Sequence, residues 1–209
     1  MSADRYKTEQ EQFWAGEFGD AYAERNAGAA RVDAVASLFE SILSRVPAPG
    51  SVIEFGANIG LNIQALRRLL PAAELAAIEI NDKAVRALRA IPALEVFATS
   101  ILDFSPARTW DLALIKGVLI HINPDALPAV YSLLYRSASR YVCVIEYYNP
   151  TPIEVTYRGH EGRLFKRDFA GELLDTYPDL HLVDYGFAYH RDLRYREGDT
   201  TWFLLEKKP

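Results

Sequence analysis

The chain has little cysteine: Cys143 is the only one among 209 residues, and it lies in the apolar run YVCVIE. A single cysteine excludes an intramolecular disulfide and every zinc or iron–sulfur site that needs several thiolates. Its apolar neighbours predict a buried strand in which the thiol is part of the core. The sequence also lacks a cluster of metal-ligating residues, so we expect no metal site.

An excess of positive charge is lacking as well. The chain has 23 Lys and Arg against 28 Asp and Glu, which gives a net charge of −5. It therefore has no dominant basic face for binding nucleic acid. No apolar run approaches the roughly 20 residues of a membrane span, and the polar start MSADRYKTEQEQ is not typical of a secretory signal. We expect a cytoplasmic protein without nucleic-acid or membrane partners; no pattern indicates an oligomeric state.

Half of the residues are apolar, which is enough for one domain with a sizeable core. Apolar segments predict strands over residues 51–55, 75–80, 94–98, 111–115 and 141–146. Amphipathic segments predict helices over residues 32–46, 61–70, 82–91, 123–134 and 168–177. The residues expected to cap helices are Asp82, Asn123 and Asp168.

The order of these elements predicts an α/β fold. Alternating strands and helices with continuous apolar strands are typical of a parallel sheet covered on both faces. Residues 181–189 and 201–206 predict two more strands with no helix between them, and so an antiparallel hairpin at the sheet's edge. We therefore expect a single domain over residues 1–209, with a doubly wound, seven-stranded, mostly parallel and Rossmann-like sheet.

Two segments stand outside this alternation. Residues 1–30 predict a small helical cap that acts as a lid over a ligand site. Its polar background is interrupted by Gly16 and Gly19, and its aromatic residues are Phe13, Trp14, Phe18 and Tyr22. Residues 149–167 form a long turn-rich loop after the fifth predicted strand. Long loops at such a position commonly carry function.

The most informative stretch is VIEFGANIG, residues 52–60, in which a strand runs into a glycine turn. Ligands bind at the carboxyl ends of such strands, and glycines let them approach the backbone. A dinucleotide site needs G-x-G-x-x-G, which Gly56, Asn58 and Gly60 do not provide. Asn58 still tolerates a left-handed backbone. Glu54 would repel a pyrophosphate but suits a ligand that carries an amino group or another cation.

A second carboxylate ends the next predicted strand. Glu79 lies 19 residues after Gly60, in LAAIEIN. A carboxylate at this position can accept hydrogen bonds from both ribose hydroxyls, and dinucleotide sites use the same arrangement. Taken together with Glu54 and the glycine spacing, Glu79 favours S-adenosylmethionine, which carries both an ammonium and a sulfonium group.

Four segments, taken in order, resemble the class I S-adenosylmethionine-dependent methyltransferases. They are IEFGANIG, AIEIN, TSILDF and WDLALIKGVLIHINPD, and the likeness covers roughly residues 32–148. More narrowly, QFWAGEFGDAYAERN and YNPTPIEVTYRGHEGRLFKRDFAGELL resemble methylases associated with the biosynthesis of pseudaminic acid, a bacterial nonulosonic sugar. The resemblance implies a Rossmann-like methyltransferase fold and a methyl acceptor from that pathway.

The resemblance also implies a set of residues at the methionine end of S-adenosylmethionine. They surround the glycine turn: Glu54, Gly56, Ala57, Asn58 and Gly60. In this set, Asn58 stands where the family commonly has a middle glycine. The ribose is implied to lie at Glu79 and the adjoining Ile80.

The adenine is implied to lie against the end of the third strand, in ATSILDF. Many family members have an aspartate here that binds the adenine amino group, but our alignment places Ser100 at that position. The contact therefore stays open between Ser100, the backbone of Ile101 and Asp103. Four more residues complete the cofactor set, two beneath the sulfonium and two in the cap, where simple packing is the alternative: Lys116, Gly117, Trp14 and Tyr22.

Candidates for the methyl acceptor lie after the fourth and fifth strands. Those for a general base, each with structural packing as the alternative, are His121, His160 and Tyr147. Those for contacting the acceptor, from the fifth strand and the loop 149–167, are Tyr148, Asn149, Tyr157 and Arg158. Arg158 and His160 together suit an acidic or phosphorylated acceptor, unless this loop is only a solvated charged segment.

These observations predict a methyltransferase for a small molecule. We expect N- or O-methylation of a sugar or nonulosonic-acid intermediate, including acidic or nucleotide-linked forms. One alternative is a nicotinamide-dependent sugar-nucleotide oxidoreductase, against which the glycine spacing and Glu54 count. The other is a non-catalytic module that binds S-adenosylmethionine without transferring its methyl group.

Overall fold

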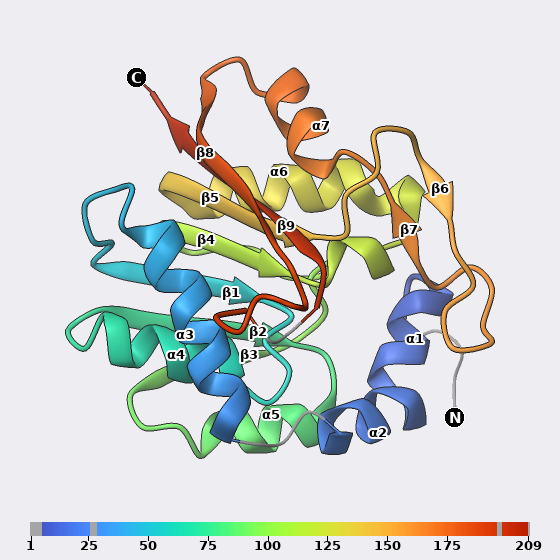
Figure 1. The fold of residues 1–209 in the computed structure, drawn as a ribbon. Coiled ribbons are helices and arrows are strands. Elements are labelled where there is room, and N and C mark those ends of the chain that lie inside the picture. The colour runs from blue at the N-terminus through green and yellow to red at the C-terminus, as the bar shows by residue number, and fades with distance from the viewer. Residues whose placement is uncertain (1–5, 26–28, 196–197, 209) are drawn as a thin grey trace.

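A seven-stranded sheet forms the centre of the computed structural model, which describes residues 6–25, 29–195 and 198–208 (Figure 1). The strand order is β3-β2-β1-β4-β5-β9-β8. The strands are β1 (Ser51–Phe55), β2 (Glu74–Glu79), β3 (Leu94–Ala98), β4 (Trp110–Lys116), β5 (Ala138–Glu146), β8 (Leu180–Ala188) and β9 (Thr200–Lys207). β1 to β5 pair in parallel, whereas β9 is antiparallel to both β5 and β8. The predicted fold and its closing hairpin are confirmed.

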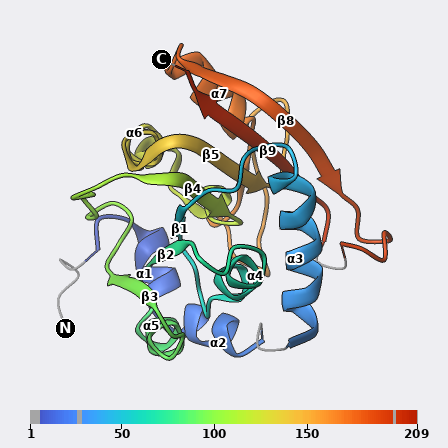
Figure 2. The same cartoon turned by 90° about the vertical axis from the view of Figure 1, so that its left-hand side faces the viewer.

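Helices cover both faces of the sheet, as continuous apolar strands require. α3 (Ala29–Leu43) and α4 (Leu61–Leu69) pack on one face with α5 (Asp82–Arg89), and α6 (Leu127–Ser137) and α7 (Phe169–Thr176) pack on the other. Figure 2 shows α3 and α4 on the side of the strands opposite to α6. Cys143 lies in β5, and its thiol is buried in the core between the sheet and the helices α3 and α4, as predicted.

Of the three predicted helix caps, one is confirmed, one is wrong, and one begins a shorter helix than expected. Asp168 caps α7, because its side chain accepts a hydrogen bond from the backbone N–H of Gly171 at 2.8 Å. Asn81, not Asp82, caps α5 by accepting from Ala84. The prediction of Asp82 as a cap is therefore wrong by one residue. Asn123 is an N-cap followed by Pro124, as predicted, but the helix that begins there is a short 3-10 helix, Pro124–Ala126, before α6.

The cap consists of two helices, α1 (Glu9–Ala15) and α2 (Glu17–Arg25). Gly16 ends α1 as expected, but Gly19 remains helical inside α2. A Cβ on Gly19 would lie 1.8 Å from the carbonyl oxygen of Trp14, so glycine lets the two helices pack closely. Residues 1–5 and 26–28 of the predicted cap lie outside the described residues.

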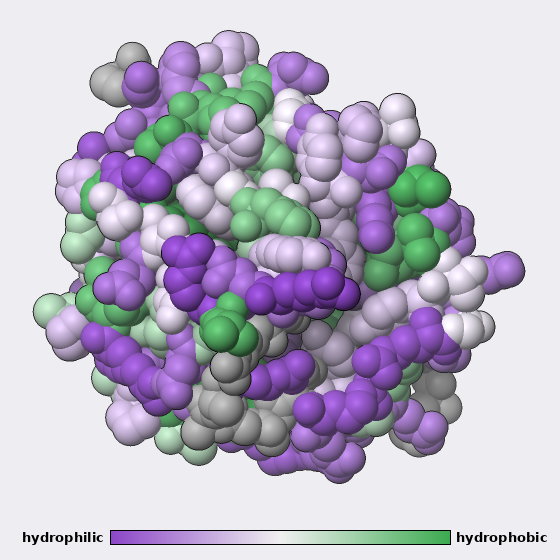
Figure 3. Space-filling model, viewed as in Figure 1, coloured by the Kyte–Doolittle hydropathy of each residue, from purple (hydrophilic) through white to green (hydrophobic). Residues whose placement is uncertain are grey.

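The long loop contains a small hairpin. β6 (Ile153–Glu154) pairs antiparallel with β7 (Phe165–Lys166), and Tyr157 bridges to His160 at its tip. Figure 3 shows a mostly hydrophilic face with hydrophobic side chains gathered over the β6–β7 segment at the right. Ile153 is 49% exposed there. In Figure 1 this hairpin stands beside α1, so the cap and the loop approach one another across the ends of the strands.

Candidate functional site

A cavity of about 280 Å³ lies at the carboxyl ends of β1, β2, β4 and β5, beneath α1 and α2. Most of the residues selected from the sequence line it. They are Trp14, Tyr22, Gly56, Ala57, Asn58, Glu79, Ile80, Ser100, Ile101, Lys116, Gly117, His121, Tyr147 and Tyr157. The parallel sheet brings these residues together because its strand ends meet along one edge.

The glycine turn adopts the backbone that its residues predict. Gly56 has φ +75°, Asn58 has φ +49° and Gly60 has φ +81°. At Gly56 a Cβ would lie 2.6 Å from Val118 Cγ2, so a side chain would press on the segment after β4. At Gly60 a Cβ would lie 2.6 Å from Ile91 Cδ1. Gly60 does not line the cavity; its role is to let α4 start close to the end of α5.

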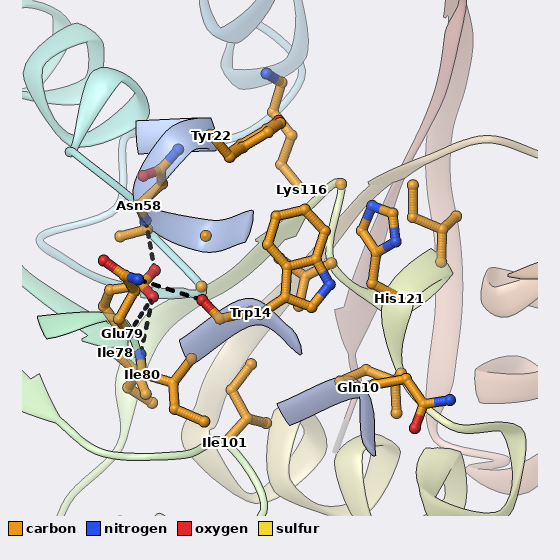
Figure 4. Close-up of a pocket in the computed structure, with 18 of the residues that line it drawn as sticks. Gln10, Trp14, Tyr22, Asn58, Ile78, Glu79, Ile80, Ile101, Lys116 and His121 are labelled. Carbon is orange, nitrogen blue, oxygen red and sulfur yellow. Dashed lines mark hydrogen bonds between the residues drawn. The ribbon is translucent and has the colours of Figure 1, made fainter. Parts of the chain in front are cut away.

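Glu79 is held at the cavity wall by three backbone donors (Figure 4). Its Oε2 accepts from the N–H of Asn58 at 2.7 Å, and its Oε1 accepts from Ile80 at 2.9 Å and Asn81 at 2.8 Å. Burial raises the pKa of this carboxyl above its ordinary value, and the three N–H groups oppose that rise. A carboxylate accepts about four hydrogen bonds, so Glu79 fixes the turn and keeps capacity for a ligand.

Glu54 is completely buried and lies behind the cavity wall. Its Oε1 accepts from Nδ2 of Asn62 at 2.5 Å, and Asn62 lines the cavity. Burial raises the pKa of Glu54 to about 7. Glu54 therefore does not line the cavity itself, and Asn62 is the residue that it holds at the wall; a direct contact of Glu54 with a ligand stays a prediction. Asn62 follows the turn by two residues and carries no signal that distinguishes it from an ordinary helix residue.

Glu11 of α1 reaches the end of β3. Its Oε1 accepts from the hydroxyl of Ser100, and both side chains are buried. Lys7 donates to the carbonyl oxygen of Leu102 at 2.8 Å and pairs with Asp103 at 2.5 Å. Asp103 does not line the cavity, so of the three residues left open for the adenine, Ser100 and Ile101 remain at its wall.

His121 lies beside two aromatic rings on the opposite part of the wall. Its ring centroid is 4.6 Å from that of Trp14 and 4.9 Å from that of Tyr157. Its Nδ1 is 2.5 Å from the carbonyl oxygen of Arg163. A carbonyl only accepts, so Nδ1 carries the proton and Nε2 keeps its lone pair. Burial lowers the pKa of His121 to about 4, which keeps the imidazole neutral near neutral pH.

Glu146 ends β5 and is a lining residue that the sequence reading overlooked. Its Oε1 accepts from the N–H groups of Val118 at 2.9 Å and Leu119 at 2.8 Å. It therefore holds the segment after β4 against β5. Burial raises its pKa to about 7. The signal was present, because a carboxylate at the carboxyl end of a central parallel strand falls at the ligand-binding edge.

No protein-family model and no curated protein match the sequence. Solved structures do match. A 1,6-didemethyltoxoflavin-N1-methyltransferase from Burkholderia thailandensis has 16% identity and a TM-score of 0.69, over 95% of this chain and 87% of that chain. A magnesium protoporphyrin IX methyltransferase from Synechocystis PCC 6803 has 14% identity and a TM-score of 0.69, over 95% and 98%. Both structures contain S-adenosylhomocysteine. The chain has a Rossmann-like methyltransferase fold.

A plantazolicin methyltransferase matches the same fold, with 14% identity and a TM-score of 0.64 over 95% of each chain. Within the part of this chain that is described, every helix is too short or too polar to cross a membrane. The same part contains no group of three or more His, Cys, Asp or Glu side chains arranged to hold a metal ion.

Some predicted residues lie away from the cavity of this methyltransferase fold. His160 is exposed and packs on the cap, with its ring 5.0 Å from that of Phe13. Arg158 lies over the ring of Tyr157 at 5.9 Å. The residues predicted for the site that do not line the cavity are Glu54, Gly60, Tyr148, Asn149, Arg158 and His160. Neither Arg158 nor His160 lines the cavity, so the structure does not support the prediction that they bind an acidic acceptor together there.

The remaining two have local partners. Tyr148 is 43% exposed and its ring lies 6.1 Å from that of Phe203, and Asn149 donates to the carbonyl oxygen of Thr151 at 2.6 Å. Both follow β5 directly, as predicted, but the chain turns outward after Tyr147. Ligands bind at the carboxyl ends of parallel strands. This rule applies to the last residues of a strand and not to the loop residues that follow them.

The cap helices α1 and α2 are bonded to both sides of the cavity. At the loop, Gln10 donates to the carbonyl oxygen of Gly162 at 2.9 Å, and Arg163 pairs with Glu9 at 3.2 Å. At the opposite side, Asn81 donates to Asp20 at 2.8 Å. The first two contacts join the cap to the long loop, and the third joins the cap to the residue that follows β2 by two positions. The cap and the loop together cover the cavity.

Proposed function

We propose that this protein is an S-adenosylmethionine-dependent methyltransferase that acts on a small molecule. The observation that carries the proposal is Glu79, held by three backbone donors beside a left-handed turn at Asn58. The supporting comparison is a fold shared with methyltransferases whose structures contain S-adenosylhomocysteine. The carboxylate is in position to accept from ribose hydroxyls while the turn is already formed.

The residues at the wall fit this cofactor. Gly117 has φ +66°, and a Cβ there would meet no described atom within 4 Å, so its lack of a side chain leaves room in the cavity. Asn62 offers an amide to a polar ligand group, and Glu54 holds it in place. When bound, S-adenosylmethionine supplies an activated methyl group, so the chain's main task is to position the acceptor, which is worth roughly 7–11 kcal/mol in favourable cases.

The acceptor is proposed to lie between the aromatic rings of Trp14, Tyr147 and Tyr157. Flat or ring-shaped molecules pack against such faces. The neutral His121, whose Nε2 carries no proton, is positioned to accept a hydrogen bond from an N–H or O–H of the acceptor and to take its proton. A sugar or nonulosonic-acid intermediate, as the resemblance implies, stays a prediction and belongs in the acceptor panel beside planar heterocycles.

We further propose that α1 and α2 act as a lid, as their aromatic pattern predicted. Their hydrogen bonds to Gly162 and Asn81 close the cavity, so exchange of ligands requires them to open. Deleting residues 1–26 is expected to weaken cofactor binding and to abolish turnover. Unchanged affinity and turnover in the shortened chain would refute the lid.

The deciding experiment is isothermal titration of S-adenosylhomocysteine into the wild-type protein and Glu79→Ala, with NAD as a parallel titrant. Binding that is lost in the variant, with no binding of NAD, supports the proposal. Binding of NAD alone contradicts it. Incubation with labelled S-adenosylmethionine and the acceptor panel, read by transfer of the label, then separates a methyltransferase from a module that only binds the cofactor.

A further inference from the structure

One end of the cavity is apolar and finishes at a carboxylate. The backbone N–H of Thr99 donates to the carbonyl oxygen of Glu79 at 3.1 Å, so the segment after β3 lies directly beside Glu79. Ile80 and Ile101 line this part (Figure 4), and Glu11 is the acidic residue that the lid adds to it. An apolar slot that adjoins a ribose-binding carboxylate has the shape and chemistry for a flat nucleobase.

The carboxylate of Glu11 is fixed from two directions. Its Oε2 accepts from the backbone N–H of Thr8 at 2.8 Å, within the capping box of α1. Its Oε1 accepts from the hydroxyl of Ser100. The Ser100 oxygen in turn accepts from the N–H of Leu102 at 3.0 Å, so its single proton is directed at Glu11. The lid and the segment after β3 thus together hold the carboxylate of Glu11 in one orientation, as a hydrogen-bond acceptor.

We propose that Glu11 selects the nucleobase of the cofactor by accepting a hydrogen bond from the exocyclic amino group of adenine. This rests on the proposed function. A carboxylate only accepts, so it favours an amino group and disfavours a carbonyl at the same place. Ser100 has no negative charge of its own and positions the acid that comes from the lid. Because Glu11 belongs to α1, recognition of the base requires the closed lid.

The test is calorimetry with two ligands, S-adenosylhomocysteine and S-inosylhomocysteine, in which a carbonyl replaces the amino group. The wild type is expected to bind the adenosyl compound at least about tenfold more tightly. In Glu11→Gln, whose amide both accepts and donates, the ratio is expected to fall to within about threefold. Glu17→Gln, an exposed glutamate of α2 with the same charge change, is the matched control and should keep the wild-type ratio.

A second variant keeps the test decisive if Glu11→Gln does not fold. Ser100→Ala removes the hydroxyl that orients Glu11 but leaves the capping box of α1 intact, so the ratio should fall there as well. Far-UV circular dichroism checks the fold of each variant. If folded variants at both positions keep the wild-type ratio, Glu11 does not read the base, although the proposed function stands. If the wild type binds neither compound, the proposed function and this inference fail together.

Discussion

The two ends of the cavity are held in different ways. At the cofactor end, the two oxygens of Glu79 are occupied by backbone N–H groups from residues close to the turn and to β2. At the acceptor end, the wall is assembled from Trp14, His121 and Tyr157, which come from distant parts of the chain. Among the described residues, buried atoms without a hydrogen-bond partner occur at both ends: Asn62 Oδ1 at the cofactor end, and Trp14 Nε1 and Glu146 Oε2 at the acceptor end. The ribose-binding part of the cofactor end is preformed by local backbone geometry, whereas the acceptor end, like the slot proposed for the adenine, depends on docking of the lid.

The largest effect is expected at the preformed end. Glu79→Ala removes the acceptor of three backbone donors, and each orphaned donor costs about 1–3 kcal/mol when buried. We therefore expect a loss of several kcal/mol in the free energy of unfolding, together with loss of S-adenosylhomocysteine binding. Urea denaturation and calorimetry measure the two effects. If Glu79→Ala keeps the wild-type affinity for S-adenosylhomocysteine, then Glu79 does not form the preformed end of the cavity.

Glu146 gives a pH-dependent test at the acceptor end. Its pKa is about 7 in the fold against an ordinary value of 4.5, so the folded state retains a proton that the unfolded state releases. Stability from this group is present below pH 4.5 and is lost as the pH rises through 7. Glu146→Gln cannot ionise and should be more stable than the wild type by up to about 3 kcal/mol at pH about 8, but not at pH about 4.

Urea denaturation at both pH values measures this difference. Glu161→Gln, an exposed glutamate in the loop, is the matched control and should show no such dependence. If Glu146→Gln and the wild type lose stability in parallel as the pH rises, then Glu146 is already ionised in the fold and the acceptor end is more polar than its burial indicates.

His121→Phe separates chemistry from binding. Phenylalanine keeps a ring beside Trp14 and Tyr157 but removes the nitrogen that takes the acceptor's proton. We expect turnover to fall by about 10²–10⁴-fold, the usual range for a general base, while affinity for S-adenosylhomocysteine changes little. Because the pKa of His121 is about 4, its titration should not appear in the wild-type pH profile near neutrality. A parallel loss of cofactor affinity would place His121 at the cofactor end instead.

The smallest effect is expected on the surface of the lid. Lys83 of α5 pairs with Glu24 of α2, and the two side chains are 37% and 66% exposed. Exposed pairs contribute about 0–1 kcal/mol, so Lys83→Met should lower stability by less than about 1 kcal/mol and leave cofactor affinity unchanged. Thermal unfolding and calorimetry test this. A large loss of affinity would mean that this pair, more than the buried contacts, holds the lid closed.

The glycine turn and Glu79 at the cofactor end could be predicted from the sequence because their information is local. β1 and β3 begin and end at the predicted residues, and Asn58 has the left-handed backbone expected of it. The alternation of strands and helices then places Glu79 beside the turn. Gly60 shows the limit of this reasoning, since this motif glycine does not line the cavity and instead allows close packing against Ile91.

The contacts of the lid, at the adenine slot as well as at the acceptor end, could be predicted only in part because they join remote segments. The capping pair Thr8 and Glu11 is visible in TEQE, but nothing local shows that Glu11 meets Ser100, 89 residues away. His160 is a plausible base by residue type, yet the turn at Arg158, with φ +50°, leaves it against Phe13 on the outer side. Residue types alone predict candidate site residues near the lid, and only the fold shows which of them reach the cavity.

The lid's contacts also bear on how the chain folds during synthesis. α1 and α2 are made before the strands of the sheet, but Gln10 and Glu9 bond to residues 152 and 154 positions further along the chain. The helices are too short to be stable alone in water, and long-range contacts form late because their loop-closure entropy is large. A segment that is made before the sheet is therefore among the last to dock. Amide hydrogen exchange should accordingly be faster in α1 and α2 than in β1 and β4.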